Sequence, residues 1–165
     1  MRSGTQNQLV RQVGEHLVAA ELGRLGVLST PFAGNVPGFD LVAVAANGRA
    51  QPIQVKAIRG GSWQFNADTF LEIEQDGKVQ RVKGLRTLAN PNMWCVFVML
   101  RQSAVDRDRF FVFQWREIQR LCAADYGEGE IRRPKNPESH HYAVRPDQLV
   151  RFEDNWDQLL RALCK

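Results

Sequence analysis

Apolar positions recur every three or four residues through the first part of the chain, and this spacing predicts an amphipathic helix over residues 8–25. The apolar positions are Leu9, Val10, Val13, Leu17, Val18 and Leu22. Gly26 follows them, and glycine commonly lies just beyond the end of a helix. Helical spacing later in the chain predicts two further helices, over residues 115–124 and 155–164.

After the first helix the pattern changes to short apolar or alternating runs, which are typical of strands. The predicted strands span residues 27–32, 39–45, 52–58, 62–65, 70–74, 93–100 and 109–114. The Asn47-Gly48 pair is a strong hairpin signal between the second and third of them. Because the strands cluster along the chain instead of alternating strictly with helices, we expect an α/β or α+β fold with a mixed sheet. Residues 33–38 are rich in turn-forming residues, which predicts a loop, and residues 126–141 are rich in glycine, proline and charge, which predicts an exposed loop.

Length and composition are those of an ordinary globular chain. With 165 residues, the simplest expectation is a single domain over residues 1–165. The net charge is +4, and 17 of the 22 basic residues are arginine, whose forked side chain suits phosphate. A phosphate-rich partner is therefore allowed, although a coding bias towards arginine explains the same count.

Cysteine spacing and hydropathy narrow the class of protein further. Cys95, Cys122 and Cys164 lie far apart with no CxxC pair, which argues against a zinc cage or a disulfide framework. We expect reduced thiols in a cytoplasmic protein. The longest apolar runs are too short to cross a bilayer, and the first residues lack the apolar core of a signal peptide, so no membrane association is expected.

Four polar residues stand on otherwise apolar elements. Glu15 heads a helical row with Val18, Ala19 and Leu22, so its carboxylate is expected to point towards the sheet. Asp40 begins the strand that follows the glycine-rich loop.

The other two, Gln54 and Lys56, lie two apart on the hairpin partner strand and therefore share one face. Counting outward from the turn, Asp40 lies opposite roughly residue 55 and is within reach of this pair. Carboxylate and amide oxygens are the ligands that Mg²⁺ or Mn²⁺ prefers. A lysine beside them would orient a water and offset negative charge in a phosphoryl-transfer transition state. A plainer alternative makes Lys56 an edge lysine, Gln54 a surface residue and Asp40 a turn cap.

These residues together resemble a known pattern. Glu15 on a helix, Gly38-Phe39-Asp40 and Ile53-Gln54-Val55-Lys56 resemble the PD-(D/E)XK nuclease superfamily. The QxK form is similar to that of modification-dependent restriction endonucleases, and the early helical glutamate resembles that of archaeal Holliday-junction resolvases. The resemblance implies a restriction-endonuclease-like three-layer fold, with a central mixed sheet flanked by helices.

The resemblance also assigns roles. It implies that Asp40 is the central metal ligand, that Gln54 replaces the usual acidic ligand, that Lys56 is the catalytic lysine and that Glu15 is an accessory acid. The backbone carbonyl of Val55 would be a further ligand. The implied activity is Mg²⁺- or Mn²⁺-dependent hydrolysis of DNA phosphodiester bonds, and a homodimer would supply two cutting sites.

One departure from the family pattern matters. Gln54 brings an oxygen without a charge, so the site holds two carboxylates and its metal affinity should be lower than with glutamate. The alternative function is therefore a catalytically inactive module with the nuclease fold that binds nucleic acid or a protein partner.

Several other residues are candidates for contacts with nucleic acid. Trp63 and Gln64 follow the basic break at Arg59, and aromatic side chains near basic loops can stack on bases, although a core position suits Trp63 equally well. A basic cluster that could contact phosphates comprises Arg81, Lys83 and Arg86. A solvated surface is the alternative for that cluster.

Overall fold

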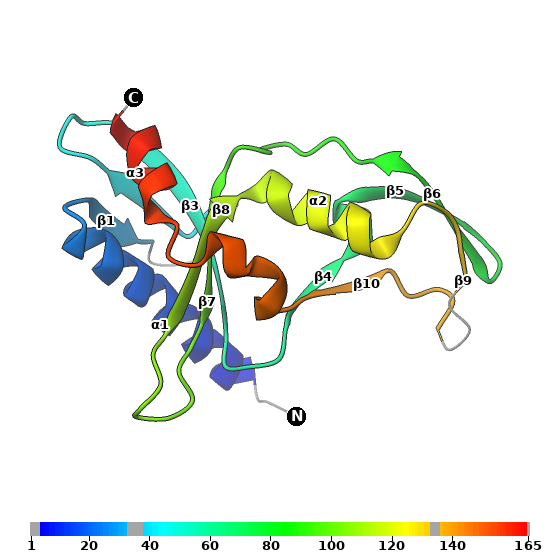
Figure 1. Cartoon of the computed structure of the whole chain (residues 1–165), viewed down its shortest axis with the longest axis horizontal. Helices are drawn as coiled ribbons and strands as arrows, with labels where there is room; N and C mark the ends of the chain where they lie inside the picture. The colour runs from blue at the N-terminus through cyan, green and yellow to red at the C-terminus, as the bar shows by residue number, and fades with distance from the viewer. Residues whose placement is uncertain (1–3, 33–37, 133–135, 165) are drawn as a thin grey trace. The chain divides into compact units, whose positions relative to one another are not determined.

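The computed structural model describes residues 4–32, 38–132 and 136–164 (Figure 1). The chain divides into two compact units built from interleaved stretches. The first unit comprises Met1–Trp63, Met93–Phe113 and Arg145–Lys165, and the second comprises Gln64–Asn92 and Gln114–Val144. The expected single domain stays a prediction, because interleaved units of this kind fit one domain or two.

The first unit is organised around a five-stranded sheet in the order β1-β2-β3-β7-β8. The strands are β1 (Leu28–Pro31), β2 (Leu41–Val44), β3 (Ala50–Ile58), β7 (Trp94–Met99) and β8 (Arg109–Gln114). β1, β2 and β3 pair antiparallel, whereas β3 and β7 pair parallel across a long crossover, so the sheet is mixed as expected. The predicted hairpin is present, and Gly48 takes a φ of 81° in its turn.

Two helices flank this sheet and bury its larger apolar core. Helix α1 (Gly4–Arg24), blue in Figure 1, contacts β1, β2 and β3, and helix α3 (Trp156–Cys164) packs into the same core. Val18 and Leu22 of α1 are fully buried there, as their spacing predicts. The core also takes Ile53 and Val55 from β3, so α1 covers the face of β3 that these residues present.

An aromatic layer covers the opposite face of the same sheet. Trp63 lies 5.0 Å from Phe97 and 5.8 Å from Phe111 between ring centroids. Phe113 lies 4.9 Å from Phe97 and 5.2 Å from Phe152, which ends the 3-10 helix η2 (Pro146–Phe152). Both faces of the central strands are therefore buried, which explains why β7 is apolar throughout.

The second unit contains two small sheets and one long helix. β5 (Leu71–Asp76), β6 (Val79–Leu85) and β9 (Gly129–Arg132) form an antiparallel three-stranded sheet. β10 (His141–Val144) pairs with β4 (Trp63–Asn66). The first residue of β4, Trp63, still belongs to the first unit. Helix α2 (Trp115–Tyr126) and the 3-10 turn η1 (Ala67–Thr69) complete the unit.

The prediction of a loop over residues 126–141 is wrong in part, because β9 lies within it. β9 pairs with β6, a strand that the polar sequence of residues 79–85 did not reveal. The amide of buried Gln80 also holds this segment, donating to the carbonyls of Pro137 and Ser139 at 2.7 and 3.1 Å. Long-range backbone pairing thus ordered a stretch whose composition favours a loop. Most of the predicted loop over residues 33–38 lies outside the described residues.

None of the helices in the described part of the chain combines the length and the apolar character needed to span a bilayer.

Candidate functional site

Asp40 lies where two strands of the first unit part. The β2–β3 pairing ends at Leu41 opposite Ile53, and the Asp40 N–H extends it by donating to the Ile53 carbonyl at 2.9 Å. β3 continues to Ile58 beyond that point. The Asp40 side chain turns into the resulting fork, where its Oδ2 accepts the Val55 N–H at 2.8 Å. The carboxylate therefore replaces the next backbone partner that β2 would have supplied.

The backbone of Val55 faces the same fork. In a strand, the N–H and C=O of one residue point towards the same neighbouring strand. Because the Val55 N–H meets the Asp40 carboxylate, the Val55 carbonyl is directed to the same side of β3. The fork thus presents a backbone oxygen beside a carboxylate.

Glu15 reaches the fork from helix α1. Its side chain is 11% exposed and that of Asp40 is 9% exposed, and one guanidinium joins their carboxylates. Arg11 Nε donates to Glu15 Oε1 at 2.9 Å, and Arg11 Nη2 donates to Asp40 Oδ1 at 2.9 Å. The hydrogen bond to Glu15 is the main reason that the pKa of Arg11 is raised above its ordinary value. Two nearly buried carboxylates are therefore held around one cationic group.

The close approach of α1 to β3 makes this arrangement possible. Gly14 lies against β3, and a Cβ added to it would stand 2.5 Å from the Cβ of Ala57. No larger residue fits at that position without a shift. The glycine lets the helix lie low enough for the next residue, Glu15, to reach the fork.

Lys56 belongs to the same electrostatic environment. Burial lowers the pKa of its ammonium below the ordinary lysine value, and the nearby charge of Asp40 opposes that effect. The positive charge of Arg11 lowers the pKa further. The Lys56 backbone carbonyl accepts the indole N–H of Trp63 at 2.9 Å, which anchors this part of β3 to the aromatic layer. Lys56 is therefore a largely desolvated cation within electrostatic range of the fork carboxylate.

Gln54 shares a face of β3 with Lys56, as predicted. Its register partner on β7 is Cys95, and that of Lys56 is Phe97, so both lie on the face covered by the aromatic layer. Burial raises the pKa of the Cys95 thiol, which therefore stays neutral beside Lys56. The Asp40 carboxylate instead meets Arg11 of helix α1, which covers the other face of β3.

The structure thus brings Glu15, Asp40 and the Val55 backbone together, with Lys56 in electrostatic range. It offers hard oxygen donors from a helix, a strand end and a strand backbone. In the described residues, no three side chains of the His, Cys, Asp and Glu types gather as a metal cluster.

Sequence reasoning missed Arg11. It lies four residues before Glu15 on the exposed side of α1, a spacing that predicts a helical ion pair but is common on helix surfaces. Its second partner, Asp40, is 29 residues away, and no local pattern indicates that contact. The sequence therefore signals the Arg11–Glu15 contact through its spacing, but not the Arg11–Asp40 contact.

The structure decides between the two interpretations of Trp63. Its side chain is 3% exposed and packs on Phe97 and Phe111, so it belongs to the core and offers no face to a base. The neighbouring Gln64 is exposed in the second unit, where its amide oxygen pairs with the His141 ring.

The predicted basic cluster is largely paired with acids. Arg81 contacts Glu130 at 3.1 Å and Asp76 at 3.5 Å, and Lys83 contacts Glu74 at 2.9 Å. These pairs on exposed strands reduce the local positive charge available to a phosphate. The two other basic candidates, Arg59 after β3 and Arg86 after β6, are exposed.

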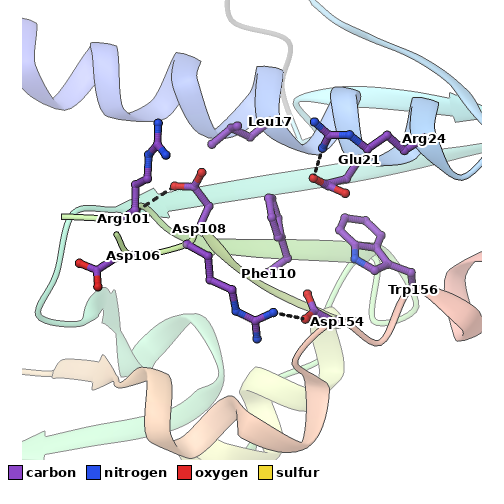
Figure 2. A pocket seen from close by; sticks show the side chains of 10 residues that line it. Leu17, Glu21, Arg24, Arg101, Asp106, Asp108, Phe110, Asp154 and Trp156 are labelled. Atoms are coloured by element: carbon purple, nitrogen blue, oxygen red, sulfur yellow. Dashed lines mark hydrogen bonds and ion pairs between the residues drawn. The ribbon is translucent and has the colours of Figure 1, made fainter. Parts of the chain in front are cut away.

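A separate cleft of about 570 Å³ lies in the first unit beside the C-terminal half of α1 (Figure 2). Phe110 and Trp156 are the aromatic side chains among the residues that line it. Charged residues of both signs line it, with four acids (Glu21, Asp106, Asp108 and Asp154) and three arginines (Arg24, Arg101 and Arg107). None of the residues of the fork lines it, so the predicted chemistry does not lie in this cleft.

Comparisons with known proteins bear on the fold. No family model and no curated protein sequence matches the chain. Among solved structures, the chain is similar to a bacterial homing endonuclease, I-Ssp6803I, with a TM-score of 0.51 and 14% sequence identity. The match covers 94% of this chain and 93% of that one. At this identity the likeness concerns the fold, and it confirms a mixed α/β architecture of a kind that an endonuclease uses.

Proposed function

We propose that the chain is a metal-dependent endonuclease that hydrolyses DNA phosphodiester bonds at the β2–β3 fork. The observation that carries this proposal is that the side chains of Glu15 and Asp40 converge on the guanidinium of Arg11, beside the Val55 backbone. These two side chains are 11% and 9% exposed. The likeness in fold to a homing endonuclease supports DNA as the substrate.

A divalent cation is the ligand that we propose for the fork. Its two carboxylates each lie 2.9 Å from a nitrogen of the same guanidinium, so both reach one positively charged group. Glu15, Asp40, the Val55 carbonyl and the amide oxygen of Gln54 would hold Mg²⁺ or Mn²⁺, since both prefer oxygen ligands. When bound, the cation would supply Lewis-acid assistance to the phosphate and lower the pKa of the attacking water.

The remaining roles fall to side chains of this chain. The Lys56 ammonium would donate a hydrogen bond to the attacking water or to a phosphate oxygen, and its charge would stabilise the negative charge that grows on the phosphate. Burial strengthens that interaction, because the ammonium is poorly screened. The Val55 N–H fixes the orientation of Asp40 throughout.

A cleavage assay tests the proposal. The full chain is incubated with supercoiled plasmid, single-stranded DNA and branched DNA, with and without Mn²⁺. We expect Mn²⁺-dependent cleavage that Lys56→Ala lowers by at least about 100-fold and that Asp40→Ala abolishes. Lys78→Ala is the matched control, because Lys78 is an exposed lysine in the second unit.

Two results would contradict the assignment. Undiminished cleavage by a folded Lys56→Ala variant removes the lysine from the mechanism. DNA binding by the wild-type chain without cleavage at any Mn²⁺ concentration favours the alternative, an inactive module with the nuclease fold. A homodimer, expected from the resemblance, is tested separately by light scattering.

A further inference from the structure

The Arg11 guanidinium bridges the carboxylates of Glu15 and Asp40. Its two donor nitrogens each reach one carboxylate at 2.9 Å. The Arg11 side chain is 49% exposed, whereas the side chains of Glu15 and Asp40 are 11% and 9% exposed. The guanidinium therefore lies on the solvent side and covers the acids from water.

We propose that Arg11 is an internal competitor of the divalent cation, so that the guanidinium and the metal occupy the Glu15–Asp40 pair in turn. This inference rests on the proposed metal site. It assigns to Arg11 the control of metal affinity, because the ion gains these two carboxylates only when the guanidinium leaves them.

The charges around the fork support mutual exclusion. Glu15 and Asp40 contribute two negative charges, and Arg11 and Lys56 contribute two positive charges, so the four side chains sum to zero with Arg11 in place. A divalent cation would then enter a neutral site beside two other cations. With Arg11 withdrawn, the remaining three side chains carry a net charge of −1, which attracts the ion.

The position of Arg11 allows the withdrawal. It lies on the exposed side of α1, so its long side chain can move to solvent without opening the core. Lys56, by contrast, is desolvated and cannot leave as easily. The exchange therefore involves Arg11 and leaves Lys56 in place for the reaction.

The effect on affinity follows from the two ion pairs that the metal must break. Partly exposed pairs of this kind are weak, and their loss corresponds to a change between about 2-fold and about 30-fold in a dissociation constant. Arg11→Gln should therefore bind Mn²⁺ tighter than the wild type by a factor in that range.

Calorimetric titration of the full chain with Mn²⁺ is the test. The variants are Arg11→Gln, Arg11→Met and Asp40→Asn, and the control is Arg24→Gln. Arg24 is also on α1 and pairs with one carboxylate, Glu21, so its loss changes the net charge equally without touching the fork. We expect tighter binding in both Arg11 variants, wild-type binding in Arg24→Gln and loss of binding in Asp40→Asn.

Thermal unfolding provides a second readout. Without metal, Arg11→Gln leaves two close carboxylates unbridged, so its Tm should fall below that of the wild type. Saturating Mn²⁺ should raise the Tm of Arg11→Gln by more than it raises the wild-type Tm, since tighter binding to the folded state stabilises it more.

The outcomes separate the two proposals. If the wild type binds Mn²⁺ through Asp40 and the Arg11 variants bind equally or more weakly, Arg11 is a structural bridge and only this inference is overturned. If the wild type and all variants bind no Mn²⁺, the proposed metal site fails and the inference fails with it. A gain shared by Arg24→Gln would also overturn it, because net charge alone would then explain the change.

Discussion

Replacing Gly14 by alanine should destabilise the chain, although alanine is the better helix former. A Cβ at position 14 would stand 2.5 Å from the Cβ of Ala57, whereas carbon atoms in ordinary contact lie about 3.5–4.0 Å apart. The helix must therefore move away from β3 by roughly 1 Å, or the strand must yield.

Two opposing effects set the magnitude. Overpacking of a core contact costs about 1–3 kcal/mol, and removing a glycine from a helix interior returns up to about 1 kcal/mol. The net expectation for Gly14→Ala is a loss of about 1–2 kcal/mol in the free energy of unfolding. Because Glu15 follows directly, the same shift should weaken Mn²⁺ binding.

Urea denaturation and Mn²⁺ titration measure these effects, and the chain supplies two controls. Gly23, on the same helix, has nothing within 4 Å of an added Cβ, so Gly23→Ala should stabilise by about 0.5–1 kcal/mol. Ala57→Gly removes the opposing methyl group and should restore Mn²⁺ binding to Gly14→Ala. Stabilisation by Gly14→Ala, or no rescue by Ala57→Gly, would refute the close approach.

Three further predictions concern charge. Gln54→Glu adds a third carboxylate to the fork and should tighten Mn²⁺ binding by roughly 10-fold in calorimetry; unchanged affinity would remove residue 54 from the site. Burial lowers the pKa of Lys56 below the ordinary lysine value of about 10.4, so the lysine should lose its proton, and the cleavage rate should fall, as the pH rises towards that value. A cleavage rate that stays constant from pH 7 to 10 would contradict a role for the charged lysine. Glu153 accepts two hydrogen bonds from Arg109, at 2.8 and 2.7 Å, which lower its pKa. Glu153→Gln should therefore lose about 1–2 kcal/mol at pH 7, and the difference should shrink as the pH falls from the ordinary glutamate pKa of about 4.3 through the lower pKa of the folded state. A difference in urea denaturation that stays unchanged down to about pH 2 would argue against this pair.

The sequence predicted the sheet of the first unit well because its signals are local. The hairpin turn at Asn47-Gly48 lies between an apolar run at residues 39–45 and an alternating run at residues 52–58, and counting from the turn placed Asp40 opposite roughly residue 55. The structure pairs Leu41 with Ile53, which puts Asp40 within one residue of that position. The helical row of Glu15 was predicted equally well, since Glu15, Val18 and Leu22 are all buried.

The features that the sequence did not reveal depend on contacts between distant residues. β9 pairs with β6 across more than 40 residues, and neither strand is apolar enough to be recognised alone. Arg11 has the spacing of an ordinary surface ion pair, and only the fold brings it to Asp40. The burial of Trp63 likewise depends on Phe97 and Phe111, which come much later in the chain.

The central claim, that the β2–β3 fork holds a divalent cation, is tested most directly by diffraction from crystals of the chain soaked in Mn²⁺. An anomalous difference map recorded near the manganese absorption edge should contain a peak bounded by the carboxylates of Glu15 and Asp40 and the carbonyl oxygen of Val55, with the Arg11 side chain displaced. A map with no peak at the fork, and with Arg11 still bridging the two carboxylates at saturating Mn²⁺, would contradict the account.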